Sequence, residues 1–468
     1  MRHPGSRCGS AIRLPGSRPC ALLWIAAALP VFLGLIALSL SKPAAAVPSF
    51  ADQTSQPCQS CHVGGFGPHL TPFGREFKLN GYTLRAKPFN VPLAAMVIAS
   101  FTHTRRDQTE PPDRFKPNNN LAFDQASLFA AGGVGRHLGG FVQLTYDGVA
   151  RHVAWDNVDL RAVTTGRLLG NDAVFGLSLN NSPTVQDAWN TTPTWGFPFT
   201  DTAVSPTPDA APLIDGALAQ QTLGLTAYTW IGQKFYLEAG AYSSPSASTL
   251  RWLGSDPTDP GSIKGLAPYG RVAFQHALGG GTAEIGGFLL KAAIDPGRDR
   301  SSGQHDRYTD IGLDASWQRP LASGDILAIN LRSVHERKDL RASCALGLLG
   351  EDIAANCARV HLNELRGDVS YTWRGKVGAT LGLFRIRGSR NDLLYGPSGR
   401  PDSDGLTAQL DYTPWGAGNS PFGLLVNLRI GIQGTAYGKF NGARHDFDGA
   451  GANASDNDSV RIFTWLAF

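Results

Sequence analysis

Charged side chains are scarce in this sequence. Asp, Glu, Lys and Arg make up 17% of its 468 residues, whereas about 25% is typical of soluble proteins. The chain is nevertheless 42% hydrophobic and contains 23 Phe, 11 Tyr and 10 Trp, a composition that excludes an intrinsically disordered protein. Its length allows either several ordinary domains or one large all-β domain.

Long apolar runs are also missing, with one exception near the N-terminus. Residues 21–40 are apolar, follow a stretch with four arginines and no acidic residue, and precede the small residues Pro43–Ala46. This order predicts a secretory signal over residues 1–46, cleaved after Ala46. A permanent N-terminal helix is the alternative, but Pro30 within the run favours cleavage. No later run has the length of a membrane-spanning helix.

The net charge changes sign when the signal is removed. The full chain has 42 Lys and Arg against 38 Asp and Glu. Residues 1–46 hold five of the basic residues and no acidic one, so the mature chain has 37 against 38, a net charge of −1. Because the basic surplus belongs to the export signal, no nucleic-acid partner is expected.

Cysteine is scarce too, and two of the six cysteines leave with the signal. Cys344 and Cys357 lie near each other in a loop-like stretch of an exported chain, where disulfides persist. We expect them to form a structural disulfide, which would stabilise the fold by about 3 kcal/mol. The other two cysteines, Cys58 and Cys61, belong to a motif with different chemistry.

From about residue 92 onward, short segments alternate apolar and polar side chains. Ile311 and Leu313 share one parity, whereas Asp310 and Asp314 share the other. This period of two predicts strands with one apolar and one polar face. A soluble β-sandwich alternates as well. Charged residues in the polar set, aromatic residues at segment ends, and short connections alternating with long ones favour an outer-membrane barrel with a wet lumen.

The segments number sixteen, and the last ends in Phe468 with a pattern like the C-terminal assembly signal of bacterial outer-membrane proteins. An even number closes a barrel with both ends in the periplasm, and about 16 strands leave an aqueous bore. The fold class predicted for residues 92–468 is therefore all-β, a 16-stranded antiparallel transmembrane β-barrel. The segments lie near 93–104, 121–132, 138–148, 156–166, 173–181, 219–230, 233–242, 268–278, 282–293, 307–318, 325–337, 360–374, 377–389, 404–414, 421–435 and 458–468.

Two further features of the barrel follow from the same pattern. The long connections, such as 183–217 and 243–265, are expected to be outer loops, and short ones to be periplasmic turns. Tryptophans at segment ends are expected in the girdles at the two membrane interfaces: Trp230, Trp317, Trp373, Trp415 and Trp465.

Cys58-Gln59-Ser60-Cys61-His62 is a C-x-x-C-H motif, which is typical of covalent c-type haem attachment. The two thiols form thioethers with the vinyl groups, and His62 becomes the proximal iron ligand. A zinc site needs four ligands, and the sequence has no second C-x-x-C to complete it. A thioredoxin-like motif requires a βαβ pattern, which is absent. We therefore expect one covalently attached haem c.

Residues 70–81 predict a short α-helix with capping signals at both ends. Phe73 and Phe77 are four positions apart and share a face of this helix, so both are expected to pack against the haem. Arg75 and Lys78 are candidates for ion pairs with the haem propionates. The alternative for these two residues is that they are ordinary solvated charges.

The distal iron ligand has two candidates. Met96 is the only methionine besides Met1, and in the first predicted strand it shares the parity of the more polar residues, so it should face the lumen. The alternative role for Met96 is ordinary packing. His69 is the rival ligand, although its short tether to His62 restricts it. His103 has the opposite parity in the strand and is the weaker choice.

Further motifs surround the haem motif in the first part of the mature chain. They are Val47-Pro48-Ser49-Phe50-Ala51, Gln53-Thr54, Pro68-x-Leu70, Gly74-Arg75-x-Phe77-Lys78 and Gly81-Tyr82. Together with C-x-x-C-H they resemble the outer-membrane monohaem cytochrome c–porin fusions of iron-oxidising bacteria, whose pattern runs A-x-P-x-F-A-R-Q-T, C-x-x-C-H, P-x-L, G-R-x-F-K and G-Y. Two departures are Asp52, where the family has Arg, and the longer link Gly64–Gly67 after the haem motif.

The resemblance implies a division of the chain and a function. Residues 1–46 would be the signal, 47–91 a small α-helical monohaem cytochrome c domain that plugs the barrel, and 92–468 the barrel in the outer membrane. The protein would take electrons from extracellular Fe(II) and pass them through the haem to a soluble periplasmic cytochrome c, as an iron:cytochrome c oxidoreductase. Its partners would be Fe(II), this cytochrome and outer-membrane lipid.

Two other functions stay open from the sequence. One is an electron conduit for a different extracellular donor or acceptor, and the other is a diffusion porin whose haem-bearing plug braces the channel or senses redox state. Acidic residues assigned to the lumen are candidates for guiding Fe(II), with pore solvation as the alternative. They are Glu238, Asp310, Asp314, Asp368 and Asp411.

Overall fold

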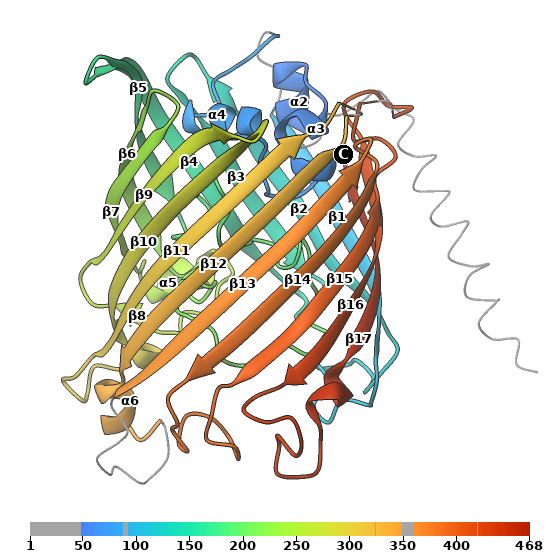
Figure 1. Ribbon diagram of the computed structural model, residues 1–468. Helices are drawn as coiled ribbons and strands as arrows, with labels where there is room; N and C mark the ends of the chain where they lie inside the picture. The colour runs from blue at the N-terminus through green and yellow to red at the C-terminus, as the bar shows by residue number, and fades with distance from the viewer. Residues whose placement is uncertain (1–47, 88–91, 323, 349–358, 419) are drawn as a thin grey trace, which may run out of the picture. The chain divides into compact units, whose positions relative to one another are not determined.

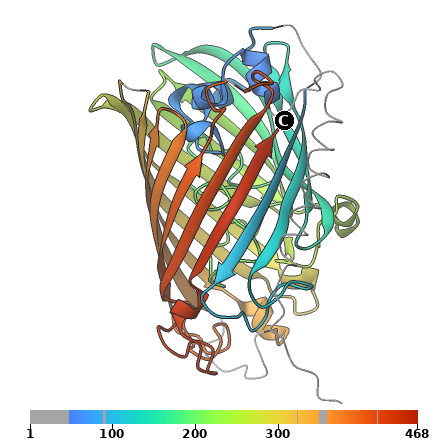
Figure 2. The same ribbon diagram turned by 90° about the vertical axis from the view of Figure 1, so that its right-hand side faces the viewer.

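The computed structural model describes residues 48–87, 92–322, 324–348, 359–418 and 420–468. Its sheet closes on itself because β1 (Leu93–Thr104) pairs with both β2 (Asn120–Val134) and β17 (Ser459–Ala467). The sheet has 17 strands, one of which is the two-residue β8 (Ser262–Ile263), an addition beside β10. The remaining sixteen form a closed antiparallel barrel, as predicted (Figures 1 and 2).

The sixteen long strands match the predicted segments one for one. β1 begins and ends where the alternation places it. The largest difference is at β16, which begins at Asn427 rather than near 421, because Ser420 and Gly423 form an isolated bridge within a turn. The other long strands are β3 (Leu138–Asp147), β4 (His152–Leu168), β5 (Asn171–Asn180), β6 (Leu223–Ile231), β7 (Phe235–Ser243), β9 (Ala267–Leu278), β10 (Gly281–Asp295), β11 (Asp306–Pro320), β12 (Ile326–Asp339), β13 (Arg359–Trp373), β14 (Val377–Gly388), β15 (Ser403–Tyr412) and β16 (Asn427–Lys439).

Side chains alternate between the lumen and the outer surface. In β11, Ile311 and Leu313 are 48% and 67% exposed, whereas Asp310 and Asp314 are 0% and 5% exposed. Large exposed apolar residues recur on the outer side of neighbouring strands. Soluble proteins rarely show such a surface, but a bilayer covers it in an outer-membrane barrel. The barrel is therefore of the outer-membrane type, and the soluble sandwich is excluded.

Five buried arginines face the lumen, and each is ion-paired with at least one carboxylate. Charge inside the barrel is thus neutralised locally, as buried charge requires. The pairs are Arg161–Asp159 at 2.9 Å, Arg271–Asp314 at 2.8 Å, Arg332–Glu364 at 2.6 Å, Arg429–Asp411 at 3.3 Å and Arg461–Asp124 at 3.2 Å.

The two ends of the barrel differ. Short turns, the C-terminus and the helices α2 (Pro48–Thr54), α3 (Cys58–Cys61) and α4 (Pro72–Leu79) gather at one end (Figure 1). The longer connections lie at the other end, with α6 (Arg341–Ala345) and the 3₁₀ turns η2 (Pro296–Arg298) and η3 (Ala454–Asn457), while α5 (Ala247–Trp252) lies part-way along the barrel. This asymmetry is the predicted one. We call the end with α2–α4 the plug end, and residues 48–82 the plug.

The loop 181–222 departs from the expected outer position, because it folds into the lumen. Trp189 and Val204 in this loop are 3% and 0% exposed, and it contacts the inner wall. The Leu213 and Ile214 amides donate to inward carboxylates of the strands, at 2.7 and 2.8 Å. Buried backbone must find such partners, and the polar inner wall supplies them.

Two of the five predicted girdle tryptophans are also placed differently. Trp230 and Trp465 are 2% and 4% exposed and face inward, whereas Trp373 is 48% exposed on the outer surface as expected. Trp230 Nε1 donates to Glu76 Oε1 of α4 at 2.8 Å. The prediction for these two was wrong because their side chains turn inward to contact the plug and do not turn outward to the lipid interface.

Some predictions fall on parts of the chain that the structure does not describe. The signal over residues 1–46 lies outside the described residues, as do residue 47 and residues 88–91. Cys344, in α6, is disulfide-bonded, but Cys357 lies outside the described residues, so the pairing stays a prediction. Among the described residues, no helix is long and apolar enough to cross a bilayer.

Candidate functional site

The C-x-x-C-H segment forms a tight, internally bonded turn. Cys58–Cys61 is a single helical turn, and the His62 amide donates to the Cys58 carbonyl at 2.9 Å. The chain then reverses, so that Val63 N donates to His69 O at 3.0 Å. Gly64 has a φ of +69°, a conformation that favours glycine. The longer link after the motif is therefore an ordered reversal within the plug.

α4 packs directly beneath this turn. Thr71 caps the helix by accepting from Gly74 N at 3.2 Å, and its own amide donates to Cys61 O at 2.9 Å. Asn80 ends the helix with a side-chain hydrogen bond to Glu76 O at 2.8 Å. The predicted helix and both of its ends are confirmed. A Cβ at Gly74 would lie 2.2 Å from Cys61 O, so only glycine lets α4 approach the motif this closely.

One cavity at the plug end brings the haem-motif residues together with the barrel wall. Its lining combines three parts of the chain: the plug, the inner wall and the loop 181–222. The plug contributes Cys58, Cys61 and His62, and the wall contributes Met96. Most other lining side chains are aromatic or apolar: Phe50, Phe66, Pro68, Leu70, Phe77, Tyr82, Phe129, Ala131, Phe141, Val185, Trp195, Trp465 and Ala467.

Burial shifts the ionisable groups of the C-x-x-C-H motif toward their uncharged forms. It raises the pKa of the Cys58 thiol to about 11 and that of the Cys61 thiol to about 12, so both thiols are uncharged at pH 7. Burial lowers the pKa of His62 to about 4, so its imidazole is neutral at pH 7 and free to bind a metal. Its Nδ1 is buried without a hydrogen-bond partner.

Met96 faces the lumen, as its parity predicts. Met96 is 4% exposed on β1, and its side chain belongs to a buried cluster with Phe66, Phe129 and Trp465. Its thioether thus borders the cavity from the barrel wall. This position is compatible both with binding a haem iron and with ordinary packing.

The two histidine alternatives lie elsewhere. His69 is 4% exposed, its Nε2 is 2.7 Å from Gln318 Nε2, and it borders a second cavity deeper in the lumen. It is not among the residues that line the haem-motif cavity. His103 is exposed on the outer surface of β1. Of the three candidates, only Met96 shares the cavity with His62.

The two phenylalanines of α4 separate. Phe77 is 5% exposed and lines the cavity, whereas Phe73 is 39% exposed and is not among the lining residues. The expectation that both pack against the cofactor was therefore wrong for Phe73. Phe73 belongs to the first turn of α4, and helical side chains lean toward the N-terminus, so it projects beyond the start of the helix.

The two basic residues of α4 separate as well. Lys78 lines the cavity, and its Nζ lies 3.3 Å from Asp187 O and 3.7 Å from Asp159 Oδ2. Burial lowers the pKa of Lys78 to about 8, and Asp159 opposes this effect. Arg75 instead turns to the wall, where its Nε donates to Gln275 Oε1 at 3.0 Å. Of the two basic residues, only Lys78 is placed to pair with an anionic group bound in the cavity, whereas Arg75 holds the plug to the barrel wall.

Hydrogen bonds from the inner wall fix the plug on several sides. These bonds come from strands on different sides of the barrel, so they hold the plug in one position. The bonds are Tyr228 Oη to Leu79 O at 2.7 Å, Gln318 Nε2 to Leu70 O at 2.9 Å, Asn427 Nδ2 to Gly65 O at 2.8 Å, Arg429 Nη2 to Gly64 O at 2.9 Å and Tyr82 Oη to Asp159 Oδ2 at 2.7 Å.

Several cavity residues were not predicted from the sequence. Trp465 packs against Phe66 in a tilted arrangement, with ring centroids 4.8 Å apart, and the loop 181–222 adds Val185 and Trp195. The inward parity of Trp465, opposite to that of Phe468, was a usable signal. The loop gave a weaker one in the density of aromatic residues between 189 and 199.

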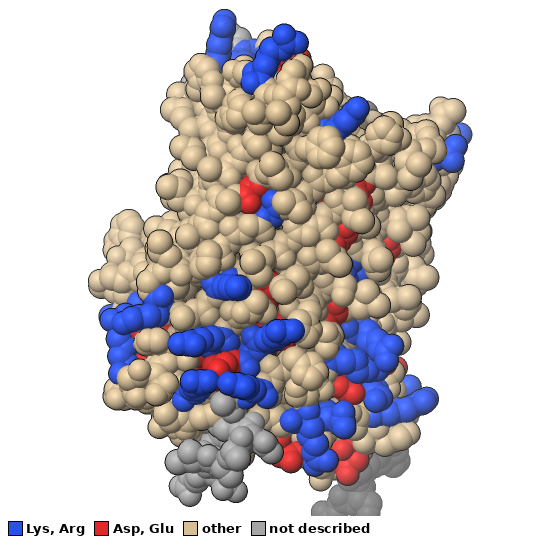
Figure 3. Space-filling view, turned by 60° about the vertical axis from the view of Figure 1, so that its left-hand side comes forward, with Lys and Arg blue, Asp and Glu red and all other residues tan. Residues whose placement is uncertain are grey.

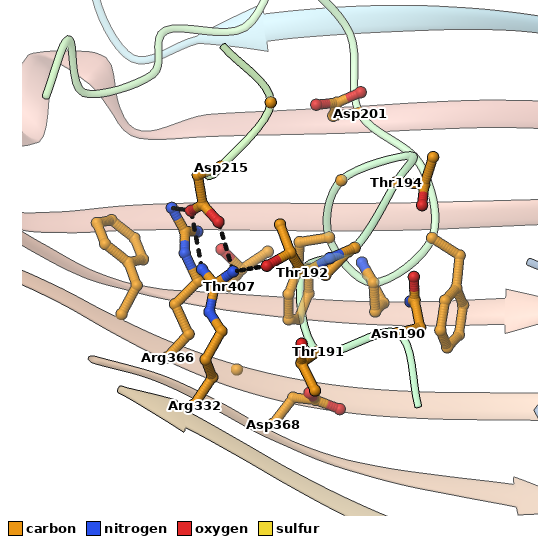
Figure 4. A pocket seen from close by; sticks show the side chains of 18 of the residues that line it. Asn190, Thr191, Thr192, Thr194, Asp201, Asp215, Arg332, Arg366, Asp368 and Thr407 are labelled. Carbon is orange, nitrogen blue, oxygen red and sulfur yellow. Dashed lines mark hydrogen bonds and ion pairs between the residues drawn. The ribbon is translucent and has the colours of Figure 1, made fainter. Parts of the chain in front are cut away.

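A second cavity of about 550 Å³ lies deeper in the lumen, between the loop 181–222 and the wall. Its lining is mixed, with many polar and charged residues beside apolar ones such as Trp189, Phe197 and Phe384. Figure 4 shows Arg332 and Arg366 directed at Asp215 of the loop, with Arg332 Nη2 2.8 Å from Asp215 Oδ2. Arg332 also donates to Thr192 of the loop and to Glu364. Ion pairs thus hold the loop inside the barrel.

The acidic lumen residues face inward as predicted but are engaged by other groups. Asp314 and Asp411 pair with arginines, Asp310 accepts from the loop backbone, and Glu238 accepts from Tyr236 Oη at 3.0 Å. Asp368 accepts from Asn330 Nδ2 at 3.1 Å. Within the described part of the chain, no group of three or more His, Cys, Asp and Glu side chains is arranged to hold a metal ion.

Comparison with known proteins gives similarity in the barrel only. Neither a protein-family model nor a curated protein sequence matches the chain. Similar solved structures include OmpT of Vibrio cholerae (10% identity, TM-score 0.41, 81% of this chain and 98% of that one) and an anion-selective porin from Comamonas acidovorans (14%, 0.43, 80% and 98%). The channel DcaP of Acinetobacter baumannii is another (11%, 0.44, 82% and 99%). Similarities this low carry no argument about function.

Proposed function

We propose that the protein is an outer-membrane electron-transfer protein that holds one covalent haem c at the periplasmic mouth of its barrel. It would accept electrons from an extracellular donor, with Fe(II) as the first candidate, and deliver them to a soluble periplasmic cytochrome c. One observation carries the proposal. Cys58, Cys61 and His62 line the same largely apolar cavity as Met96, the single methionine of the mature chain.

Each residue has a defined task in this proposal. Cys58 and Cys61 would hold the group by two thioethers, and neutral His62 and Met96 would bind its iron. The bound haem would supply a one-electron carrier. The aromatic lining excludes water, and Lys78 places a positive charge at the cavity. The residues present therefore fit a haem in number, type and polarity.

The surroundings support a role in transfer across the membrane. The plug end carries the short turns and the C-terminus, which in barrels of this type face the periplasm. A carrier docked there would approach the plug directly. On the far side, the lumen continues from the plug into the polar cavity, which a small hydrated donor such as Fe(II) could reach from the exterior.

The proposal is tested on intact cells that produce the protein in a host able to mature c-type cytochromes. Fe(II) is added outside, and the visible spectrum of the cells is followed. We expect reduced c-type haem to appear promptly in these cells and not in cells with the C58A/C61A variant. If a different external compound reduces the haem and Fe(II) does not, the electron-conduit function is supported but its donor is not Fe(II). Reduction by neither would overturn the proposal.

A second candidate function is solute diffusion through the barrel, and the polar cavity of about 550 Å³ in the lumen favours it. The two functions differ in a planar-bilayer experiment with the purified protein. An electron conduit closed by its plug and loop gives little ionic conductance. Steady channel conductance comparable to that of a general porin, without haem reduction from outside, would favour diffusion.

A further inference from the structure

Five basic side chains lie on the outer surface of the barrel near the end opposite the plug. They occupy five consecutive strands, β10 to β14, each a few residues from the strand end. Because neighbouring strands are about 4.8 Å apart, the five strands cover about 20 Å of the surface. We call these residues the basic belt: Lys291, Arg307, Arg337, Arg359 and Arg385.

The belt residues point outward, on the same face as the lipid-facing leucines. All five are exposed, and each has the parity of an exposed apolar residue further along its strand. Arg307 is in phase with Ile311, and Arg385 with Leu383, which are 48% and 63% exposed. The belt therefore borders the apolar band. On the face shown in Figure 3, Lys and Arg side chains gather at the lower end, beneath a zone with few charges.

No belt residue forms an ion pair in the described part of the chain. Arg337 Nε donates to His335 Nε2 at 3.3 Å, and Asp404, which is opposite Arg385 in the register, pairs with Arg387 instead. The ion pairs of this region use other residues: Lys338–Glu336, Arg341–Asp339, Arg366–Glu364 and Arg387–Asp404. Asp339 is opposite both Arg307 and Arg359 in the strand register, yet its ion pair is with Arg341. In the lumen, by contrast, each of the five buried arginines of the barrel wall is paired with a carboxylate.

Unpaired cations at the edge of a hydrocarbon layer need an anionic partner from outside the chain. Basic clusters next to a membrane-embedded surface bind anionic lipid headgroups, and arginine matches phosphate with two parallel hydrogen bonds. A soluble acidic protein does not fit here, because the belt is continuous with surface that lipid covers.

We propose that the basic belt binds the phosphate groups of a phosphorylated glycolipid of the outer leaflet, of the lipopolysaccharide class. The acyl chains lie against the apolar band while the phosphates contact the belt. The binding anchors the barrel at a fixed depth. This inference rests on the membrane location of the barrel and is independent of the haem.

The test uses the full-length protein in non-ionic detergent, with EDTA present so that divalent cations cannot bridge phosphates. Native mass spectrometry measures binding of bisphosphorylated lipid A and of the same lipid without its phosphates. Each basic residue at a charged lipid surface contributes about fivefold in affinity. The R307Q/R337Q/R359Q variant should therefore bind the bisphosphorylated lipid about 100-fold more weakly. The control variant K234Q/R319Q/R374Q removes the same charge from exposed positions at the plug end and should bind normally.

Three results would overturn the proposal. They are equal binding of the two lipids by the unmodified protein, an equal loss in the control variant, and displacement of the lipid by inorganic phosphate at micromolar concentration. The third result would assign the belt to free phosphate. The comparison of the two lipids needs no variant, so it holds even if a variant folds poorly.

Discussion

Two cavities inside the described part of the barrel differ in character. The one at the plug end is lined mainly by aromatic and apolar side chains around Cys58, Cys61 and His62. The one deeper in the lumen has a mixed lining with many hydroxyl, amide and charged groups, among them Asp215, which is clamped by Arg332 and Arg366. Both are built from the same inner wall, and the segments that enter the lumen make the difference.

The contrast indicates what each cavity can hold. Apolar walls around two thiols and a neutral imidazole suit a large planar group with an apolar face, and they would exclude water from it. Ion pairs and hydroxyl groups suit water and small ions, and they secure the loop 181–222. The cavity at the plug end is therefore the feature on which the proposed haem rests.

The largest expected effect comes from the attachment cysteines. In the C58A/C61A variant the covalent haem stain on the outer-membrane protein should disappear completely, because no thioether can form. The control is S60A, which changes one of the two residues between them and should retain the full stain. Retained covalent haem in C58A/C61A would contradict the assignment of the apolar cavity.

The second effect concerns the wall side of the same cavity. M96A should keep the covalent haem but lose the methionine–iron absorption of the oxidised protein, and its reduction potential should fall, because a methionine axial ligand raises it. I98V, on the same inward face, is the matched control and should leave the spectrum unchanged. An unaltered M96A spectrum, together with an altered H69A spectrum, would transfer the role to His69.

The third effect probes the polar cavity. R332M would leave Asp215 and Glu364 with only the half-exposed Arg366 as their shared cation, and loss of one partner of a buried ion pair costs up to about 3–5 kcal/mol. We expect the loop 181–222 to loosen, which limited proteolysis and a rise in bilayer conductance would report, while the haem spectrum stays normal. K234M, in an exposed turn, should do neither. A changed haem spectrum in R332M would show that the two cavities are not independent.

The smallest expected effect is at the contact between α4 and the haem motif. G74A would place a methyl group 2.2 Å from Cys61 O, and overpacking of this kind costs about 1–3 kcal/mol. Haem occupancy and the thermal midpoint of the haem absorbance should fall. The control G434A adds a methyl group whose nearest neighbour is 3.9 Å away, and it should be neutral.

Much of the barrel follows from the sequence, because lipid and lumen impose a strict period of two. The alternation placed β1 at its observed bounds and set the parity of Met96 correctly. The capping residues of α4 act locally, so Thr71 and Asn80 also fixed the helix ends in advance.

The remaining parts depend on contacts between distant segments, which periodicity does not record. Trp230 points inward because Glu76 of the plug offers a hydrogen-bond acceptor. The loop 181–222 enters the lumen because arginines and carboxylates of many strands meet it there. Phe73 and Arg75 are separated from the cavity by the orientation of α4, which Gly74 permits.

The most direct test of the central claim is the intact mass of the protein purified from outer membranes of a host that matures c-type cytochromes. We predict the mass of a chain beginning at Val47 plus one haem, with the haem retained after denaturation on the peptide that contains Cys58 and Cys61. The mass of the bare polypeptide, from a host in which a control c-type cytochrome is fully matured, would contradict the account.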